Sequence, residues 1–522
     1  MCAMKRITVL AAAALSLTSV TALTGFAPGA ATTKTSPFPF AEKTDRLDRF
    51  RQQRVAWAEC KDKQLTERGV ECAKVTVPLD YREPGGRTLD IAISRIRATD
   101  PAKRRGILQT NPGGPGGRGL GTPADLRAFM SAEAAARYDI IGMDTRGLGE
   151  SGALDCGLTR MSWMRAAGPG PAAFDEAWRL AKQDADACWK KYPDTLPHFS
   201  TRNIARDVDL VRSALGERKT SWYGTSYGTV LGATYAQMFP ERVDRLVLDS
   251  APDPAEYGIR MFQAMGPANE RALDDFAAWA APRHAAYGLG TTPAAVRATF
   301  EELIRRADEN PIPIGGVRLD GRMVPFLPYV YGLDEENNAE FAGSLRQILD
   351  AADGKPVEAN EILRWLLNMM YRPQGSGAEV DLSATLAILC ADVSMPRSAD
   401  WYRDAIERAR PAQPVFGPVL NAPVPCAFWE KKPLEKLTRI DNSVPALQIQ
   451  ATGDTRTTYA GGLGMHRAMK GSRLVTVPVR THGVYLSPHS PCAHRITDDY
   501  LVNGTLPARD STVPADGPCP VR

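Results

Sequence analysis

The sequence has little net charge, few histidines and no recognisable metal-binding spacing, and each shortage excludes a class of function. Basic residues exceed acidic ones by only four in 522 residues, too small an excess to predict nucleic acid or an anionic membrane as a partner. His489, Cys492 and His494 are the nearest approach to a metal site, and their spacing matches no compact zinc pattern. We therefore predict neither a metal nor another cofactor.

An apolar run near the N-terminus is too short and too interrupted to span a membrane. Residues 7–23 follow Lys5 and Arg6, contain Ser16 and Ser19, and lead to small residues that end at Ala31. A span requires roughly 20 continuous apolar residues. The pattern is typical of a secretory signal peptide, so we predict a signal peptide over 1–31 and a secreted protein without a membrane span after cleavage.

The pentapeptide Gly224-Thr225-Ser226-Tyr227-Gly228 indicates a catalytic serine. It lies between a strand-like run, 219–223, and a helix-like run that begins at Thr229. A serine on such a sharp turn has an exposed hydroxyl, and its small neighbours leave room for the strained backbone. Ser226 is therefore the predicted nucleophile.

A base and an acid follow in the order expected for an α/β-hydrolase. His482 follows the strand-like run 473–479, and Asp454 follows the strand-like run 445–450. The order Ser226, Asp454, His482 is that of an α/β-hydrolase triad. Asp249, which follows the run 245–248, is the alternative acid.

The glycine-rich run Asn111 to Gly119 predicts the oxyanion hole. It follows the strand-like run 106–110, and its backbone N–H groups can approach the serine closely because glycine has no side chain. We expect the N–H of Tyr227 and that of Gly113 or Gly114 to be the two donors. A phosphate-binding loop is the alternative, but two prolines interrupt the run and no Gly-Lys-Ser/Thr follows it.

These motifs give the chain a family resemblance. Asn111 to Gly119, the run 144–151 and the block 224–250 resemble the secreted tripeptidyl aminopeptidases of actinomycetes, α/β-hydrolase serine peptidases related to the prolyl aminopeptidases. The resemblance extends from about Trp57 to Cys519. It implies release of short peptides, tripeptides in particular, from free N-termini through an acyl-enzyme.

Two positions depart from the pattern of that family. Arg118 stands where serine is common, and Thr457-Thr458 stand where a Thr-Pro pair is common. The first lies in the glycine loop and bears on substrate preference, whereas the second lies in the loop of the acid. Neither removes a catalytic group.

The cysteines suggest disulfides. Cleavage of the signal peptide removes Cys2 and leaves an even number in an oxidising compartment. Sequence alone allows 105 pairings of eight cysteines, and we expect neighbours along the chain to pair. The expected pairs are Cys60 with Cys72, Cys156 with Cys188, Cys390 with Cys426, and Cys492 with Cys519.

Alternating strand-like and helix-like runs predict an α/β-hydrolase fold, with a mostly parallel sheet, helices on both faces and an inserted helical cap. The predicted segments are an N-terminal segment at 32–56, core at 57–252, cap at 253–443 and core again at 444–522. The cap region is rich in helical periodicity, and a lid there would restrict entry to chain ends.

A peptide with a free amine requires a carboxylate beside its ammonium group. Asp253 and Glu256, just after the 245–248 strand, are the candidates. The predicted protein is thus a secreted, monomeric serine exopeptidase that acts on peptides. The alternatives are an esterase or amidase that acts on a small molecule, because the same site hydrolyses esters, and an inert binding protein that has kept the fold.

Overall fold

The computed structural model describes residues 45–158, 164–168, 170–371, 381–517 and 519. The predicted signal peptide at 1–31 and most of the predicted N-terminal segment at 32–56 therefore lie outside the described residues. Residues from Arg46 onward cluster as one compact unit.

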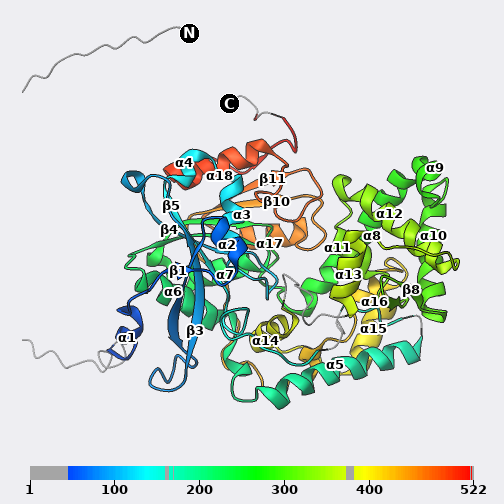
Figure 1. Ribbon diagram of the computed structural model, residues 1–522, viewed down its shortest axis with the longest axis horizontal. Coiled ribbons are helices and arrows are strands. Elements are labelled where there is room, and N and C mark those ends of the chain that lie inside the picture. The colour runs from blue at the N-terminus through cyan, green and yellow to red at the C-terminus, as the bar shows by residue number, and fades with distance from the viewer. Residues whose placement is uncertain (1–44, 159–163, 169, 372–380, 518, 520–522) are drawn as a thin grey trace, which may run out of the picture. The chain divides into compact units, whose positions relative to one another are not determined.

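One large sheet carries the fold, in the strand order β1-β2-β3-β5-β4-β6-β7-β10-β11-β12 (Figure 1). Its strands are β1 (Ala58–Glu59), β2 (Glu71–Pro78), β3 (Thr88–Ile96), β4 (Gly106–Asn111), β5 (Tyr138–Met143), β6 (Thr220–Thr225), β7 (Val243–Asp249), β10 (Ala446–Ala451), β11 (Ser472–Val477) and β12 (Ser511–Thr512). Pairing is antiparallel as far as β3–β5 and parallel from β5 to β12. The expected mostly parallel sheet is confirmed.

Helices cover both faces because the buried strands are apolar on both sides. Successive residues of β6 enter opposite cores: Trp222 packs into the cluster that contains Leu231, and Tyr223 into the cluster that contains Tyr500. Helices α6 (Thr201–Ala214) and α7 (Tyr227–Met238) supply the first face, and α3 (Thr122–Phe129) and α18 (Pro491–Asn503) the second. The sheet is thereby held rigidly between two layers.

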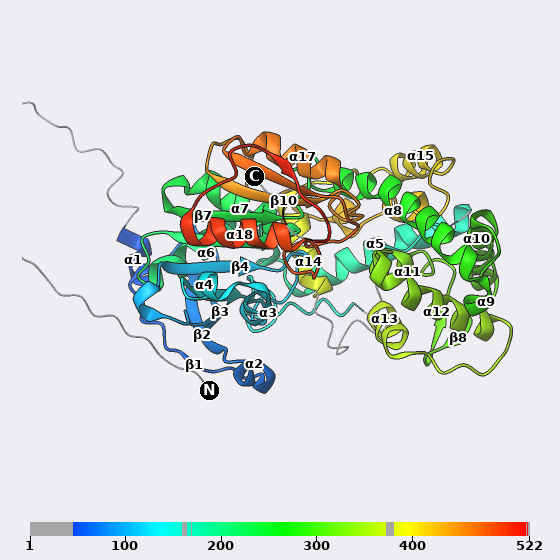
Figure 2. The same ribbon diagram turned by 90° about the horizontal axis from the view of Figure 1, so that it is seen from above.

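A mainly helical insertion connects β7 to β10, as expected (Figure 2). Its longer helices are α8 (Ile259–Ala280), α10 (Pro293–Glu309), α12 (Glu335–Ala352), α13 (Glu361–Tyr371), α14 (Leu382–Asp392) and α15 (Ala399–Ala409), with the short α11 (Phe326–Tyr331) and α16 (Gly417–Leu420) between them. A small hairpin, β8 (Ile312–Ile314) and β9 (Val317–Leu319), completes the insertion.

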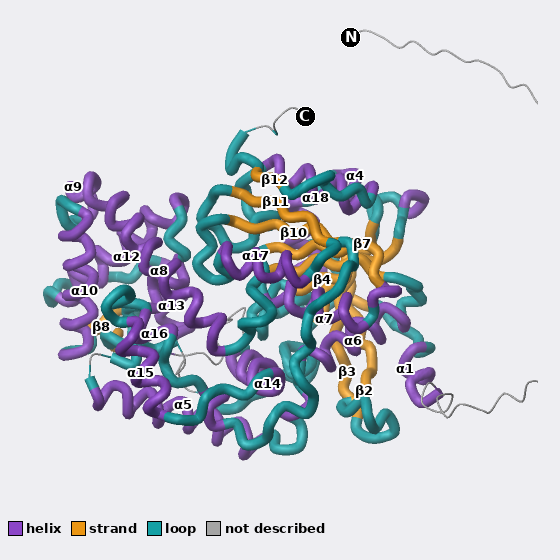
Figure 3. Tube along the Cα trace, turned by 180° about the vertical axis from the view of Figure 1, so that it is seen from behind, coloured by secondary structure: helices purple, strands orange, loops and turns teal. Residues whose placement is uncertain are grey.

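Helix α5 (Pro171–Lys191) falls within the range predicted for the core but packs against this insertion. Phe174 of α5 lies in one apolar cluster with Tyr402 and Ile406 of α15, and both helices are drawn at the insertion's end of the molecule in Figures 1 and 3. The backbone N–H of Ala167 also donates to the Pro418 carbonyl at 2.9 Å. The cap is therefore built from two separate stretches of the chain.

Four disulfides join Cys60–Cys72, Cys156–Cys188, Cys390–Cys426 and Cys492–Cys519, which are the neighbour pairs named from the sequence. The bond to Cys519 leaves Cys492 unable to serve as the metal-binding thiolate considered above. Among the described helices, none combines the length and apolarity that crossing a bilayer requires.

Candidate active site

Ser226 occupies a strained turn between β6 and α7. Its φ of 59° and ψ of −123° lie in a backbone region that residues with a Cβ atom rarely adopt. The two flanking glycines make this turn possible, because a Cβ on Gly224 would collide with the Gly228 carbonyl and a Cβ on Gly228 with that of Asn111. The geometry is that of a nucleophile elbow, which exposes the serine hydroxyl above the sheet.

His482 and Asp454 are paired at the carboxyl ends of the neighbouring strands. The Nδ1 atom of His482 lies 2.9 Å from Oδ2 of Asp454, and the Asp454 side chain is fully buried. This contact orients the ring and leaves Nε2 as the nitrogen available to another group. Ser226 and His482 line the same cavity.

Thr457 belongs to this cluster, although sequence reasoning placed it only in the loop of the acid. Its hydroxyl donates to Asp454 Oδ2 at 2.7 Å and lies 3.3 Å from His482 Nδ1, and its N–H donates to Asp454 Oδ1 at 3.0 Å. Burial would raise the pKa of Asp454, but His482 and the hydrogen bonds from Thr457 and Arg456 hold that pKa below its usual value. Asp454 therefore stays ionised beside the imidazole.

Asp249, the alternative acid, has a different task. Its carboxylate accepts the N–H groups of Val484 and Tyr485 at 2.9 and 2.8 Å and the Tyr223 hydroxyl at 2.9 Å. Burial raises its pKa despite these bonds. Asp249 therefore binds the backbone of the loop that follows His482, whereas the imidazole of His482 pairs with Asp454.

The glycine loop after β4 lies against the serine turn. A Cβ on Gly113 would come within 2.8 Å of the Ser226 Cβ and 3.4 Å of the Tyr227 nitrogen. The Gly113 N–H donates to Asn111 Oδ1 at 3.0 Å. Both predicted loop donors line the cavity, but the Gly113 N–H is engaged within its own loop.

The cavity has a volume of about 1160 Å³ and two unlike walls. The core wall, as we define it, contains Gly113, Gly114, Ser226, Tyr227, Thr457 and His482. The cap wall contains Met261, Met265, Phe326, Tyr329, Trp365 and Met369, from α8, α11 and α13. One wall presents hydrogen-bonding groups, and the other presents aromatic and thioether side chains.

Asp253 and Glu256 do not line this cavity among the described residues, which differs from the expectation for the ammonium site. Asp253 Oδ1 accepts the Ala255 N–H at 2.8 Å, so it closes a local turn. The carboxylates along the cavity are Asp62, Asp125, Asp144 and Glu150. Sequence reasoning missed them because they come from loops and helices distant in the chain.

The two departures from the family pattern take different places. Arg118 is exposed and lines the cavity. Burial raises the pKa values of the nearby Asp144 and Asp381, and the charge of Arg118 offsets a part of that rise. Thr458 caps helix α17 (Tyr459–Ala468) by accepting the Gly461 N–H at 3.2 Å. Arg118 therefore adds a cation to the substrate cavity, and Thr458 has a structural role.

Known proteins resemble this chain over most of its length. The family described as an alpha/beta hydrolase fold matches residues 110–313, and the one described as a TAP-like protein matches residues 413–513. The chain is 33% identical to the tripeptidyl aminopeptidase of Streptomyces lividans over 488 residues, which covers 88% of this chain and 86% of that protein.

Two further relatives come from Mycobacterium tuberculosis (strain H37Rv). The serine protease Hip1 is 29% identical over 478 residues, with 87% of this chain and 90% of the relative covered. Carboxylesterase B is 28% identical over 469 residues, with 84% and 85% covered. The relatives thus include both a peptidase and an esterase by name.

Proposed function

Because the chain belongs to the tripeptidyl aminopeptidase family of α/β-hydrolases, we propose that it is a serine exopeptidase that releases tripeptides from free N-termini. The observation that carries this proposal is the 33% identity over 88% of the chain, which extends through the insertion as well as the core. The catalytic roles below are our assignments, supported by the geometry of the site.

Ser226 acts as the nucleophile and His482 as the base. The Ser226 oxygen attacks the carbonyl carbon of the scissile amide, and its proton passes to Nε2 of His482, since Nδ1 faces Asp454. Collapse of the tetrahedral intermediate breaks the carbon–nitrogen bond, and the imidazolium gives its proton to the leaving amine. Water then attacks the acyl-enzyme in the same way and releases the tripeptide.

Asp454 stabilises the imidazolium, and its lowered pKa keeps it charged throughout. Thr457 supports this pair by a hydrogen bond to Asp454 Oδ2, the oxygen that faces His482. The oxyanion takes one hydrogen bond from the Tyr227 N–H at the start of α7. We assign the second donor to Gly114, because the Gly113 N–H is engaged by Asn111.

The cap wall suits apolar side chains of a short peptide, since all six of its residues are aromatic residues or methionines. The ammonium group of the substrate would find its carboxylate among Asp62, Asp125 and Glu150. Asp144 is less suitable, because it is buried and its carboxylate accepts the Gly119 and Glu150 N–H groups at 2.9 Å each, whereas Asp62 and Asp125 are exposed and Glu150 is half-buried. Asp125 and Glu150 pair with Arg68 at 2.6 Å and with Lys61 at 3.1 Å, and an ammonium group would share or replace these partners.

We further propose that the protein is secreted and acts as a monomer. The residues at 1–31 have the pattern of a signal peptide, and four disulfides fit an oxidising compartment. The state of association can be measured by analytical ultracentrifugation, in which a species near 57 kDa or below is expected.

A panel of chromogenic substrates tests the function. It contains free-amine mono-, di- and tripeptide amides, an N-blocked tripeptide amide and a simple ester, with Ser226→Ala as the control. Cleavage of the free tripeptide but not of the blocked one is the expected result. Hydrolysis of the ester alone would keep the nucleophile and reassign the protein as an esterase.

A further inference from the structure

Helix α14 (Leu382–Asp392) is an unusual member of the insertion because it is buried along its length. Every residue from Ser383 to Asp392 is buried, although most surface helices expose one face. Leu382, Thr385 and Leu389 line the cavity. The helix therefore lies directly behind the reaction site rather than over its mouth.

The first turn of α14 holds the glycine loop. The Asp381 N–H donates to the Gly116 carbonyl at 2.8 Å. The Thr385 hydroxyl lies 2.5 Å from the Pro115 carbonyl oxygen and 2.7 Å from that of Asp381. These bonds fix the peptide groups that follow Gly114, one of the two oxyanion donors assigned above.

The last residue of α14 holds the other donor through a chain of hydroxyl groups. Asp392 accepts the Thr201 N–H at 2.7 Å, the Thr201 hydroxyl at 2.5 Å and the Tyr257 hydroxyl at 3.3 Å. The Thr201 oxygen lies 2.7 Å from the Tyr227 hydroxyl. Since the single Thr201 hydroxyl proton is given to Asp392, the Tyr227 hydroxyl donates to Thr201.

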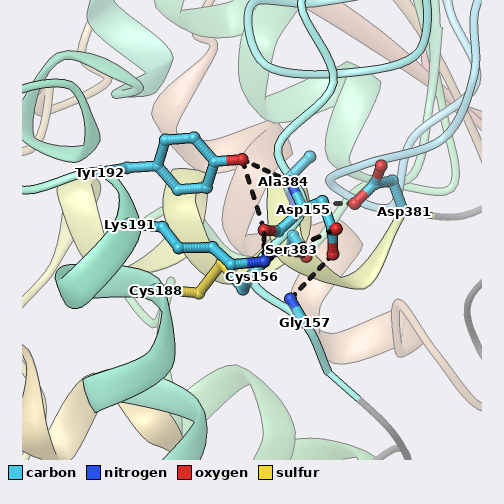
Figure 4. The surroundings of a disulfide bond; sticks show 9 residues. All are labelled: Asp155, Cys156, Gly157, Cys188, Lys191, Tyr192, Asp381, Ser383 and Ala384. Carbon is cyan, nitrogen blue, oxygen red and sulfur yellow. Dashed lines mark hydrogen bonds and ion pairs between the residues drawn. A yellow bond between two sulfur atoms is a disulfide. The ribbon is translucent and has the colours of Figure 1, made fainter.

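Both ends of the helix are also anchored. Ser383 Oγ accepts the Cys156 N–H at 3.2 Å, beside the disulfide that joins Cys156 to Cys188 of α5 (Figure 4). Cys390 is joined to Cys426. The carboxylate of Asp392 is buried at 5% exposure, so its three donors cannot be replaced by solvent without a rearrangement.

We propose that α14 positions the oxyanion hole, with Thr385 holding the Pro115–Gly116 peptide of the loop that carries Gly114 and the Asp392–Thr201–Tyr227 chain holding the side chain of Tyr227. This proposal rests on the proposed serine mechanism but not on the identity of the substrate. Asp392, Thr201 and Thr385 are positioning residues, since they act through groups that touch the substrate. The helix thus connects the insertion to the oxyanion hole through two separate sets of hydrogen bonds, one at each of its ends.

The decisive variants change single hydroxyl groups. Thr201→Val and Tyr227→Phe each remove one link of the chain, Thr201→Ser restores it, and Tyr402→Phe is the matched control for a buried tyrosine outside the chain. We expect kcat at pH 8 to fall about tenfold in the first two variants, less than the roughly 10²- to 10³-fold lost with a whole donor. Because both remove the same chain, the double variant should fall no further.

A tetrahedral adduct separates positioning from general stability. The Ser226 oxygen adds to the carbonyl carbon of a tripeptide aldehyde, and the aldehyde oxygen then occupies the oxyanion hole. Binding of the free tripeptide product does not require the hole. Thr201→Val should weaken aldehyde binding about tenfold and leave product binding and KM unchanged, and Thr201→Ser should recover the wild-type value. Thr385→Val with Thr385→Ser tests the other end in the same way.

Equal losses of aldehyde and product affinity, or an unchanged kcat in folded Thr201→Val and Tyr227→Phe, would overturn the proposal. The outcome is independent of the peptidase assignment. If the wild-type protein hydrolyses only the ester of the panel, the proposed function fails, and the same variants are then measured with that ester and the matching aldehyde.

Discussion

The two walls of the cavity differ in the groups that they present, and the proposed function assigns the reaction to one wall and substrate recognition to the other. The core wall is made of groups that follow buried strands, and two of them, Thr457 and His482, are held by Asp454 behind the wall, which makes four hydrogen-bond contacts. The cap wall has apolar side chains on separate helices, and Trp365 is 40% exposed. A preorganised wall stabilises a transition state, whereas an apolar one contributes affinity roughly in proportion to the area it buries.

The comparison predicts that substitutions in the core wall change kcat, and the largest effect is expected at Ser226. Ser226→Ala removes the attacking oxygen, and kcat on the free tripeptide amide should fall by about 10⁶-fold. Binding of the tripeptide product, measured by calorimetry, should stay near the wild-type value. Residual turnover above about one-thousandth of wild type would place the nucleophile elsewhere.

The two buried aspartates offer the next contrast. Asp454→Asn disturbs the orientation and charge of His482, and kcat should fall by about 10⁴-fold. Asp249→Asn weakens the support below the His482 loop, so we expect a loss of about 1–3 kcal/mol in the free energy of unfolding and less than a tenfold loss in kcat. Steady-state kinetics and urea unfolding of both variants measure this, and the reverse ranking would make Asp249 the acid.

The pH dependence of stability tests the burial of Asp392 at the end of α14. Burial raises the pKa of Asp392 to about 7, although hydrogen bonds from Thr201 and Tyr257 oppose the rise. The folded protein then holds a proton that the unfolded chain releases above about pH 4, so the contribution of this group to stability falls as pH rises from about 4 to about 7 and is constant beyond.

Asp392→Asn should therefore flatten the stability profile between pH 4 and 7, by an amount on the order of 4 kcal/mol at most. Urea unfolding at several pH values measures this. Asp400→Asn on α15 is the control, because its side chain is 85% exposed. A profile for Asp392→Asn that is parallel to that of wild type would contradict the burial argument.

The cap wall should respond in KM. Trp365 and Ile362 are almost equally exposed on α13, at 40% and 39%, but only Trp365 lines the cavity. Trp365→Ala should raise KM about three- to tenfold for tripeptides with apolar side chains, a loss of about 1 kcal/mol, with kcat nearly unchanged. Ile362→Ala should change neither value, and equal effects in the two variants would remove Trp365 from the binding site.

The smallest effect is expected outside the cavity. Glu256→Lys reverses a charge that lies on neither wall, so cleavage of the free tripeptide amide should stay within twofold of wild type. Glu150→Gln, which alters a carboxylate that does line the cavity, should raise KM for free-amine substrates but not for the ester. A strong effect of Glu256→Lys alone would return the ammonium site to the position first expected from the sequence.

Much of the fold, and the candidate triad, could be predicted from local sequence. The strands that end before Ser226, Asp454 and His482 were recognisable because buried parallel strands are continuous apolar runs, and Gly224 and Gly228 mark the turn. The parallel sheet and the inserted helices followed from the same periodicities. The packing of α5 on α15 did not, since an amphipathic helix does not reveal which surface it will meet.

The sequence by itself determined the order of the elements and the chemistry of the turns, because backbone strain and apolar periodicity are properties of near neighbours. Only the tertiary structure placed the His482 ring against Asp454 rather than Asp249, left Asp253 and Glu256 outside the cavity lining, and brought Thr457 and α14 to the site. Both aspartates end neighbouring strands, at Asp249 and just beyond Ala451. Their roles differ because a hydrogen bond depends on a few tenths of an ångström between residues far apart in the chain.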